Sequence, residues 1–236
     1  MIRLFAFVLF SLPYQLLAQQ RKAFSISGHS TFYNGQRLFI QGGVLSTFNY
    51  NDFNFVQETV DTVYKSFSTV LVQHNQFTIN GFQKYPHPFQ VSIYDATTES
   101  GTSSQFFFAD AGAVNIEIND LFTNKYLGNQ LLSKSNKEYQ HLKKLYSNTV
   151  DTLNGKVHDF KAKQKTIQKY ITQHPNSYVA LWDLVIDYAI DKNWKNDDDI
   201  KMILKNALLL SSTIKKTTTY KTLLEKIKKD LELSTG

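Results

Sequence analysis

The side chains able to carry out chemistry are scattered along this chain and form no recognisable catalytic motif. The sequence has six histidines and no cysteine, which excludes a thiolate nucleophile, thiol–disulfide exchange and thiolate zinc sites. No two histidines have the short spacing of a metal-binding motif. Neighbouring strands would bring His74 and His87 together, with Asp95 as a third ligand, but the favoured interpretation is a turn for His74 and a loop for His87. We therefore expect no metal and no cofactor.

Hydrolytic chemistry has few candidate residues. Segment 27–30 (Ser-Gly-His-Ser) supplies a hydroxyl and an imidazole, but the sequence lacks the Gly-x-Ser-x-Gly turn that exposes a serine nucleophile. Asp95 with Glu99, and Asp110 with Glu117, are nominal acid–base pairs, yet spacing in loops does not fix the separation of roughly 5–10 Å that glycoside hydrolysis needs. No glycine-rich phosphate loop occurs. The sequence predicts a protein that is not an enzyme, with an Asp/Glu-dependent hydrolase as the lowest-ranked alternative.

Four aromatic residues within eight positions form the candidate partner-binding site. They are Phe48, Tyr50, Phe53 and Phe55, set among Asn and Asp. Aromatic side chains give a large contact area at low rotamer cost, so they concentrate in binding sites. In a polar loop they predict a surface for a sugar or a peptide. The equal alternative is that they anchor the loop onto a sheet.

Lysines cluster in two segments of the second half of the chain. Lys161, Lys163, Lys165 and Lys169 lie in one predicted helix, and six more lie near the end of the chain. These clusters fit an anionic lipid surface or an acidic partner, but the solvated faces of amphipathic helices are the favoured interpretation. No Arg-rich or aromatic-interleaved reader motif occurs, so nucleic acid is not an expected partner.

The first residues have the three-part layout of a secretory signal peptide. Met1, Ile2 and Arg3 form a short basic start, residues 4–17 are an almost unbroken apolar run, and Ala18 is a small residue suited to cleavage. The run is shorter than the ~20 residues of a membrane-spanning helix and contains a proline, so a membrane anchor is the less favoured alternative. We predict a signal peptide over residues 1–18 and a periplasmic or secreted protein. It has no lipoprotein cysteine, and we expect no transmembrane span after cleavage.

The composition changes sharply near residue 120. Residues 19–120 contain 13 Phe and 3 Leu, whereas residues 121–236 contain 2 Phe and 17 Leu, and the net charge changes from −3 to +8. Aromatic residues suit pleated sheets, whereas Leu and Lys suit helices. We predict an α+β protein with an antiparallel β-sandwich-like module at residues 22–120 and a helical bundle at residues 121–233.

Turn residues divide the first half into short strands. Residues 34–35 (Asn-Gly) and 74–75 (His-Asn) lie between apolar segments, and both predict hairpins. A further turn at residues 110–112 separates two more strands. In the second half, segment 178–190 is apolar nearly all round, which predicts the buried central helix of the bundle. Asn176 or Ser177 is predicted to cap that helix.

The order of these features resembles a known family. An aromatic-rich sandwich contains Phe77-Thr78-Ile79-Asn80-Gly81, then Phe106-Phe107-Phe108 before Ala111-Gly112, and the helices contain His174-Pro175-Asn176-Ser177-Tyr178-Val179-Ala180-Leu181. This order resembles the N-terminal region of a group of bacterial periplasmic proteins. In those proteins a β-rich domain of unknown function precedes a thioredoxin-like domain of the disulfide reductase and peroxiredoxin-like type. The resemblance covers most of residues 20–236.

The resemblance implies the accessory region alone. In that family the thioredoxin-like domain follows the last helix and carries a Cys-x-x-Cys pair, which no position of this sequence matches. The chain is then expected to be a natural short form, a truncated gene product or an expression fragment. The main functional prediction is an exported, non-catalytic interaction or accessory module whose partner is a periplasmic redox protein, a cell-envelope protein, a peptide or a glycan. The alternative is a carbohydrate- or peptide-binding cell-envelope protein.

Overall fold

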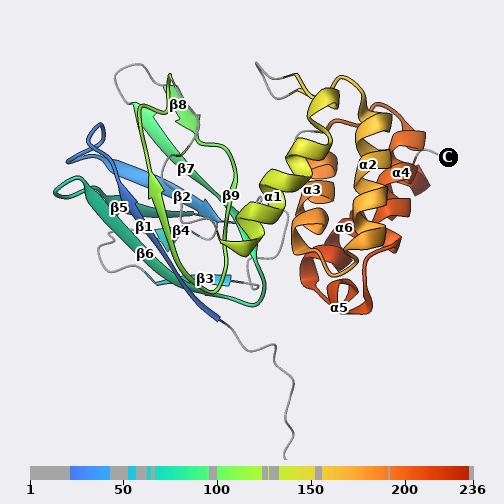
Figure 1. Ribbon diagram of the computed structural model, residues 1–236, viewed down its shortest axis with the longest axis horizontal. Coiled ribbons are helices and arrows are strands. Elements are labelled where there is room, and N and C mark those ends of the chain that lie inside the picture. Colours follow the sequence, from blue (N-terminus) through green and yellow to red (C-terminus); the bar gives the residue numbers. More distant parts are fainter. Residues whose placement is uncertain are drawn as a thin grey trace, which may run out of the picture.

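The computed structural model places a β module of two sheets beside a bundle of helices (Figure 1). The structure describes residues 22–42, 53–56, 63–64, 67–95, 100–123, 127, 133–151, 156–190 and 192–233. Mostly antiparallel strands precede the helices along the chain. The α+β class that the change in composition predicts is therefore confirmed.

Sheet 1 has four strands in the order β10-β1-β6-β3. They are β1 (Lys22–His29), β3 (Phe53–Val56), β6 (Gln76–Gln83) and β10 (Gly112–Glu117). β1 and β6 are antiparallel, with Ser27 opposite Thr78, whereas β1 and β10 are parallel, with Ser27 opposite Asn115. The first and last strands of the module are thus direct neighbours.

Sheet 2 contains the other described strands in the order β4-β5-β2-β7-β8, with β9 also paired to β7. They are β2 (Arg37–Gly42), β4 (Val63–Tyr64), β5 (Phe67–Leu71), β7 (His87–Asp95), β8 (Ser100–Ser103) and β9 (Phe107–Ala109). Every described pairing in this sheet is antiparallel. Sheet 2 therefore differs from sheet 1, which contains a parallel pair.

Alternate residues of the strands face an apolar core between the two sheets. In β1, the buried Phe24 and Ile26 alternate with the less buried Ser25 and Ser27, as the two-residue period of a strand requires. The rings of Phe24 in sheet 1 and Phe89 in sheet 2 have centroids 5.3 Å apart. The two sheets therefore pack face to face. Other buried members of this core include Leu38, Ile40, Val70, Phe77, Ile79, Val91, Val114 and Ile116.

The short turns of the β module lead from one sheet to the other. Residues 74 and 75 have φ values of 52° and 62°, as expected for a tight turn. An isolated bridge between Gln73 and Gln76 closes this turn, but β5 lies in sheet 2 and β6 in sheet 1. The turn at residues 34–35 likewise leads from β1 to β2. The two predicted hairpin pairings are therefore wrong, because the apolar faces of the flanking strands are buried against each other across the core.

The helical bundle contains six α-helices in the described chain. They are α1 (Lys134–Leu145), α2 (Phe160–Gln173), α3 (Tyr178–Val185), α4 (Asp197–Leu208), α5 (Ser212–Lys215) and α6 (Thr218–Leu233). Ser177 caps α3 by accepting a hydrogen bond from the main-chain nitrogen of Ala180 at 2.8 Å, so the predicted cap is confirmed. None of the described helices is long and apolar enough to cross a bilayer.

Helix α3 is the buried centre of the bundle, as its composition predicts. Trp182 is 1% exposed, and α3 packs against α1, α2 and α4. After Val185 the chain continues as a π-helical turn, Ile186–Ile190. Such turns place one extra residue in a helix and often occur at functional sites.

The β module and the bundle meet along α1, α3 and α6. The indole Nε1 of Trp182 donates a hydrogen bond to the main-chain oxygen of Pro86, 3.1 Å away. The hydroxyls of Tyr85 and Thr219 lie 2.9 Å apart, and Phe108 of β9 belongs to the apolar core of the helices. Figure 1 shows α1 between the sheets and the other helices.

Candidate functional site

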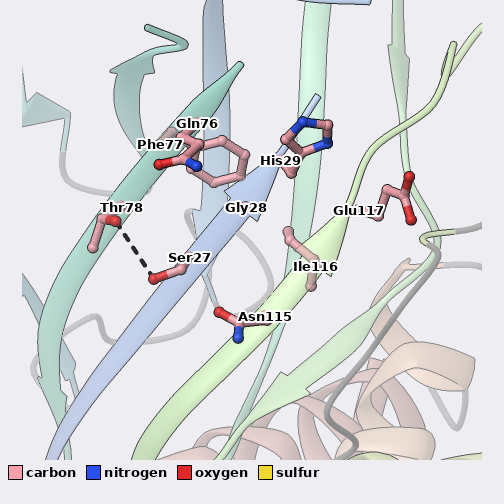
Figure 2. Close-up of a pocket in the computed structure, with 9 residues that line it drawn as sticks. All are labelled: Ser27, Gly28, His29, Gln76, Phe77, Thr78, Asn115, Ile116 and Glu117. Atoms are coloured by element: carbon pink, nitrogen blue, oxygen red, sulfur yellow. Dashed lines mark hydrogen bonds between the residues drawn. The ribbon is translucent and has the colours of Figure 1, made fainter. Parts of the chain in front are cut away.

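A hollow of about 450 Å³ opens on sheet 1. Figure 2 shows the residues that line it, which are Ser27, Gly28, His29, Gln76, Phe77, Thr78, Asn115, Ile116 and Glu117. All nine belong to β1, β6 and β10, and no residue of sheet 2 contributes to this lining. We call it the outer hollow, because it opens on the face of sheet 1 that points away from the apolar core.

Two rows of polar side chains cross the outer hollow. The strand register places them as Thr78, Ser27 and Asn115 in one row and Gln76, His29 and Glu117 in the next. Residues opposite each other on paired strands point to the same face of a sheet. Successive outward residues on one strand are about 7 Å apart. The parallel pairing of β10 with β1 therefore supplies one third of the polar lining.

Gly28 lies on β1 between the two rows. A Cβ atom at this position would lie 2.1 Å from the ring of Phe77, so any other residue would displace that ring. The buried Phe77 ring crosses β1 on the core side of sheet 1. Glycine thus lets an aromatic ring support the strand directly beneath the outer hollow.

The six outward side chains of the outer hollow are polar and carry little charge. The hydroxyls of Ser27 and Thr78 lie 3.4 Å apart, and the amides of Gln76 and Asn115 each present a donor and an acceptor. Glu117 is the single carboxylate among the nine lining residues, and no Lys or Arg is among them. The arrangement suits an uncharged ligand with many hydroxyls better than a phosphate or carboxylate, which basic side chains usually bind.

The outer hollow does not bring the predicted hydrolytic residues together. Among the described residues, no hydrogen bond joins the hydroxyl of Ser27 to His29, and Ser27 instead contacts its neighbour on β6. Asp110 is not part of the lining, and its Oδ2 accepts a hydrogen bond from the main-chain nitrogen of Ser135 at 3.0 Å. Glu117 therefore has no second carboxylate beside it in the lining.

A second polar group lies inside the helical bundle. Lys163 of α2 is 4% exposed, and its Nζ lies 2.6 Å from Oδ1 of Asp187 and 3.7 Å from Oδ2 of Asp183. The ammonium group also lies 4.6 Å from the centroid of the Tyr146 ring. The hydroxyl of Tyr146 donates a hydrogen bond to Oδ1 of Asp183 over 2.9 Å. We call Lys163, Asp183 and Asp187 the buried ion cluster.

Amide side chains satisfy one carboxylate of the buried ion cluster but not the other. Gln164 donates to Oδ2 of Asp187 at 2.7 Å, and Asn193 donates to Oδ1 at 2.9 Å. Asn206 of α4 in turn donates to Oε1 of Gln164 at 2.8 Å. Oδ2 of Asp183, in contrast, is buried without a hydrogen-bond partner in the described chain. A charge on Asp183 is therefore poorly compensated.

Burial raises the pKa of the Asp183 carboxyl to about 6, because desolvation disfavours the charged form. Attraction by Lys163 opposes this rise, and the nearby carboxylate of Asp187 adds to it. The Tyr146 hydroxyl and Lys143 also favour the charged form of Asp183. Burial lowers the pKa of Lys143 itself. Asp183 therefore changes charge at mildly acidic pH.

The buried ion cluster was not predicted from the sequence, because the favoured interpretation places Lys163 on a solvent-exposed helix face. The other lysines of segment 161–169 are exposed, as expected for a solvated face, but Lys163 is buried. A signal was available, because Lys163 lies one turn before Ile167 and one turn after Phe160, within the apolar stripe of α2. No residue of the cluster lines the outer hollow, so the cluster is a feature of the bundle core.

The histidines proposed as metal ligands have other surroundings. His74 lies in the tight turn before β6. His87 is buried at the junction of the two modules, where its Nδ1 lies 2.5 Å from the main-chain oxygen of Tyr85 and its ring stacks on the Tyr85 ring. The side chains of Asp95 and Glu99 lie outside the described residues. Within the described chain, no group of three His, Asp or Glu residues is placed to hold a metal ion.

The candidate aromatic residues are only partly described. Phe48 and Tyr50 lie outside the described residues. The main chain of Phe53 and Phe55 forms the edge strand β3, with Phe53 opposite Gln83 of β6. These two positions thus belong to sheet 1 and not to a loop. A partner-binding role for the four aromatic residues stays a prediction.

The chain has little similarity to known proteins. No protein-family model and no curated protein matches it. One solved structure to which it is similar is the carbohydrate-binding module CBMbc (family CBM26) from Eubacterium rectale Amy13K in complex with maltoheptaose, with a TM-score of 0.27 and 6% identity. The match covers 48% of this chain and 49% of that chain, so this chain spans about half the length of that structure. Because a TM-score this low does not indicate a shared fold, the match gives no information about the ligand of this chain.

Proposed function

We propose that this protein is an exported, non-catalytic binding module that recognises a neutral carbohydrate in the outer hollow. The observation that supports the proposal is the double row of outward polar side chains from β1, β6 and β10. Sugar hydroxyls both donate and accept hydrogen bonds, as do hydroxyl and amide side chains. A concave polar site with convergent hydrogen-bonding groups matches such a ligand.

Two other ligand classes fit the outer hollow less well. An extended peptide usually adds to a sheet along an unpaired strand edge through main-chain hydrogen bonds. The outer hollow instead lies on the face of three strands, of which β1 and β6 are paired on both sides and β10 is the edge strand. An anionic ligand would find no Lys or Arg among the nine lining residues. A neutral carbohydrate needs neither a free edge nor a positive charge.

The same lining supports the proposal of a role in binding without catalysis. Glu117 is its single carboxylate, whereas glycoside hydrolysis usually requires a pair. The Ser27 hydroxyl hydrogen-bonds to Thr78 of β6 and not to His29. This arrangement does not support Ser27 as a nucleophile activated by a histidine. The accessory role beside a thioredoxin-like reductase rests on the sequence resemblance and stays a prediction.

The proposal is tested by binding of the purified protein to immobilised neutral and charged glycans, followed by calorimetry with the best glycan. Gln76→Ala and Asn115→Ala are each expected to weaken binding about fivefold, since a lost hydrogen bond is worth about 1 kcal/mol. Gln140→Ala, on the exposed face of α1, is the matched control and should bind normally. The proposal is wrong if no neutral glycan binds, or if both hollow variants bind as the unaltered protein does.

Export is a separate part of the proposal. The apolar run of residues 4–17 followed by Ala18 supports it. When the full chain is produced in a Gram-negative host, the intact mass of the periplasmic product should correspond to a chain that begins at Gln19. A product that still begins at Met1 would contradict cleavage and would leave the binding proposal unaffected.

A further inference from the structure

Between the outer hollow and the first residue of β1, the outward side chains of this strand are small. Ser27 is followed back along β1 by Ser25 and Ala23. The opposite residues of β6 are larger, with Asn80 beside Ser25 and Phe82 beside Ala23. The three small residues therefore form the floor of a trough with β6 as one wall. We call this surface, which is continuous with the outer hollow, the β1 trough.

The β1 trough is longer than a single sugar. From Gln76 to Phe82, the outward residues of β6 span about 20 Å at roughly 3.4 Å per residue. On the other side, β10 places Ala113 opposite Ser25 and Asn115 opposite Ser27. The β10 side chain is short beside Ser25, where it is Ala113, and longer beside the outer hollow, where it is Asn115. The β1 trough is therefore an extended strip with the larger residues of β6 along one side.

An exposed aromatic ring lies at the far end of the trough. Phe82 is 42% exposed. The preceding residues of β6 on the same face, Thr78 and Asn80, are polar. Its neighbour Ala23 on β1 has only a methyl side chain. An aromatic face carries partial negative charge and attracts the polarised C–H groups of a flat partner. Phe82 thus offers a stacking surface where the rest of the trough offers hydrogen bonds.

We propose that the β1 trough binds a linear, extended, neutral oligosaccharide, with one sugar ring stacked on Phe82 and a later one hydrogen-bonded in the outer hollow. This inference rests on the proposed function and specifies its ligand as a chain. The length of the β1 trough favours an extended chain, such as a β-1,4-linked one, over a coiled one. No Lys or Arg occurs among the floor residues or their described partners on β6 and β10 between Ala23 and Ser27, so an anionic chain finds no cationic partner there.

The length of the ligand tests this inference directly. Calorimetry with the cello-oligosaccharide and chito-oligosaccharide series, from monosaccharide to hexasaccharide, is expected to show affinity in at least one series that rises at least about tenfold from the monosaccharide to the tetrasaccharide and then levels off. Phe82→Ala should remove this gain and leave the affinity for the shortest bound member unchanged. Phe122→Ala, at another exposed aromatic residue, is the matched control and should retain the gain.

A second variant blocks the trough without removing a binding group. Ser25→Tyr places a bulky side chain on the floor and should weaken binding of the tetrasaccharide, but not of a monosaccharide that occupies the outer hollow. Affinity independent of chain length, together with normal binding by Phe82→Ala and Ser25→Tyr, overturns the inference. If Gln76→Ala and Asn115→Ala still weaken binding of a glycan in that case, the proposed function stands. If no neutral glycan of any length binds, both fail.

Discussion

The side-chain amide of Asn136 makes both hydrogen bonds to the main chain of Phe108, as a neighbouring β-strand would. Its Nδ2 donates to the Phe108 oxygen at 2.8 Å, and its Oδ1 accepts from the Phe108 nitrogen at 2.7 Å. Asn136 is 1% exposed, and Ser133 at the start of α1 also donates to the Phe108 oxygen at 3.0 Å. The first turn of α1 therefore docks on β9 and joins the bundle to sheet 2.

Asn136→Ala is expected to lower the free energy of unfolding by about 2–4 kcal/mol, because it leaves a buried N–H without its partner and weakens the satisfaction of a buried carbonyl. Urea unfolding followed by circular dichroism measures the change. Asn148→Ala, at an exposed position after α1, should stay within about 0.5 kcal/mol of the unaltered protein. A loss below that limit in Asn136→Ala would mean that the docking contact contributes little.

Trp182→Ala is expected to lower the free energy of unfolding by about 3–5 kcal/mol, because it opens a cavity in the centre of the bundle. It also removes the hydrogen bond to Pro86 and the contact with the His87 ring, 5.3 Å away between centroids. Trp182→Phe keeps much of the volume and loses the hydrogen bond, so its loss should be smaller than that of Trp182→Ala. A loss under about 1 kcal/mol for Trp182→Ala in urea would show that α3 is not the core of the bundle.

Protonation of Asp183 is expected to stabilise the protein. Its folded-state pKa of about 6 lies above the ordinary value of 3.8, so the folded state binds the proton more tightly than the unfolded state does. The contribution of this group to stability therefore falls as pH rises from about 4 to 6, by on the order of 3 kcal/mol. Thermal unfolding of Asp183→Asn should show a flatter pH dependence and a higher melting temperature near pH 7.5 than the unaltered protein.

The control for Asp183 is Asp198→Asn, because Asp198 is exposed and pairs with Lys201 at 3.5 Å on the surface. Its pH profile should match that of the unaltered protein. Lys163→Met should be strongly destabilising above pH 6, because two buried carboxylates would then lose their cation. Identical pH profiles for Asp183→Asn and Asp198→Asn would contradict the assignment of the mildly acidic titration to Asp183.

Gly28→Ala is expected to destabilise the β module by about 1–3 kcal/mol, because the added Cβ overlaps the Phe77 ring. The displaced ring should also shift β1 beneath the outer hollow, so any ligand of the hollow should bind more weakly. Gly28→Ala combined with Phe77→Leu removes the overlap and should recover part of the stability. Absence of any recovery would mean that the two positions do not act on each other.

Tyr50→Ala and Phe53→Ala test the aromatic segment that the sequence singles out. If these residues form a partner surface, the melting temperature should stay unchanged while binding to periplasmic partners or glycans weakens. A fall of several degrees would identify them as packing residues, since about 1 kcal/mol moves the melting temperature by about 2–4 °C in a domain of this size. Differential scanning calorimetry separates the two outcomes.

Local features of the fold are predictable from the sequence because they depend on neighbouring residues. The tight turn at residues 74–75 and the cap at Ser177 lie where the sequence predicts them. The end of α2 at Gln173 follows from Pro175, which disfavours helix at the preceding residue. The change in composition near residue 120 indicates the α+β order. The turn, the cap and the helix end each depend on a few neighbouring residues, and the change in composition is a property of whole segments.

The tertiary structure decides which segments meet. Turn residues reverse the chain but do not specify whether the next strand joins the same sheet. The turn between β5 and β6 lies where the sequence predicts it, yet the two strands belong to different sheets. Lys163 has the same residue type as its exposed neighbours, and only the carboxylates of α3 and the following π-helical turn make its burial tolerable. The outer hollow likewise requires the parallel pairing of β1 with β10. Such pairing depends on burial summed over the whole core, which no local stretch of sequence contains.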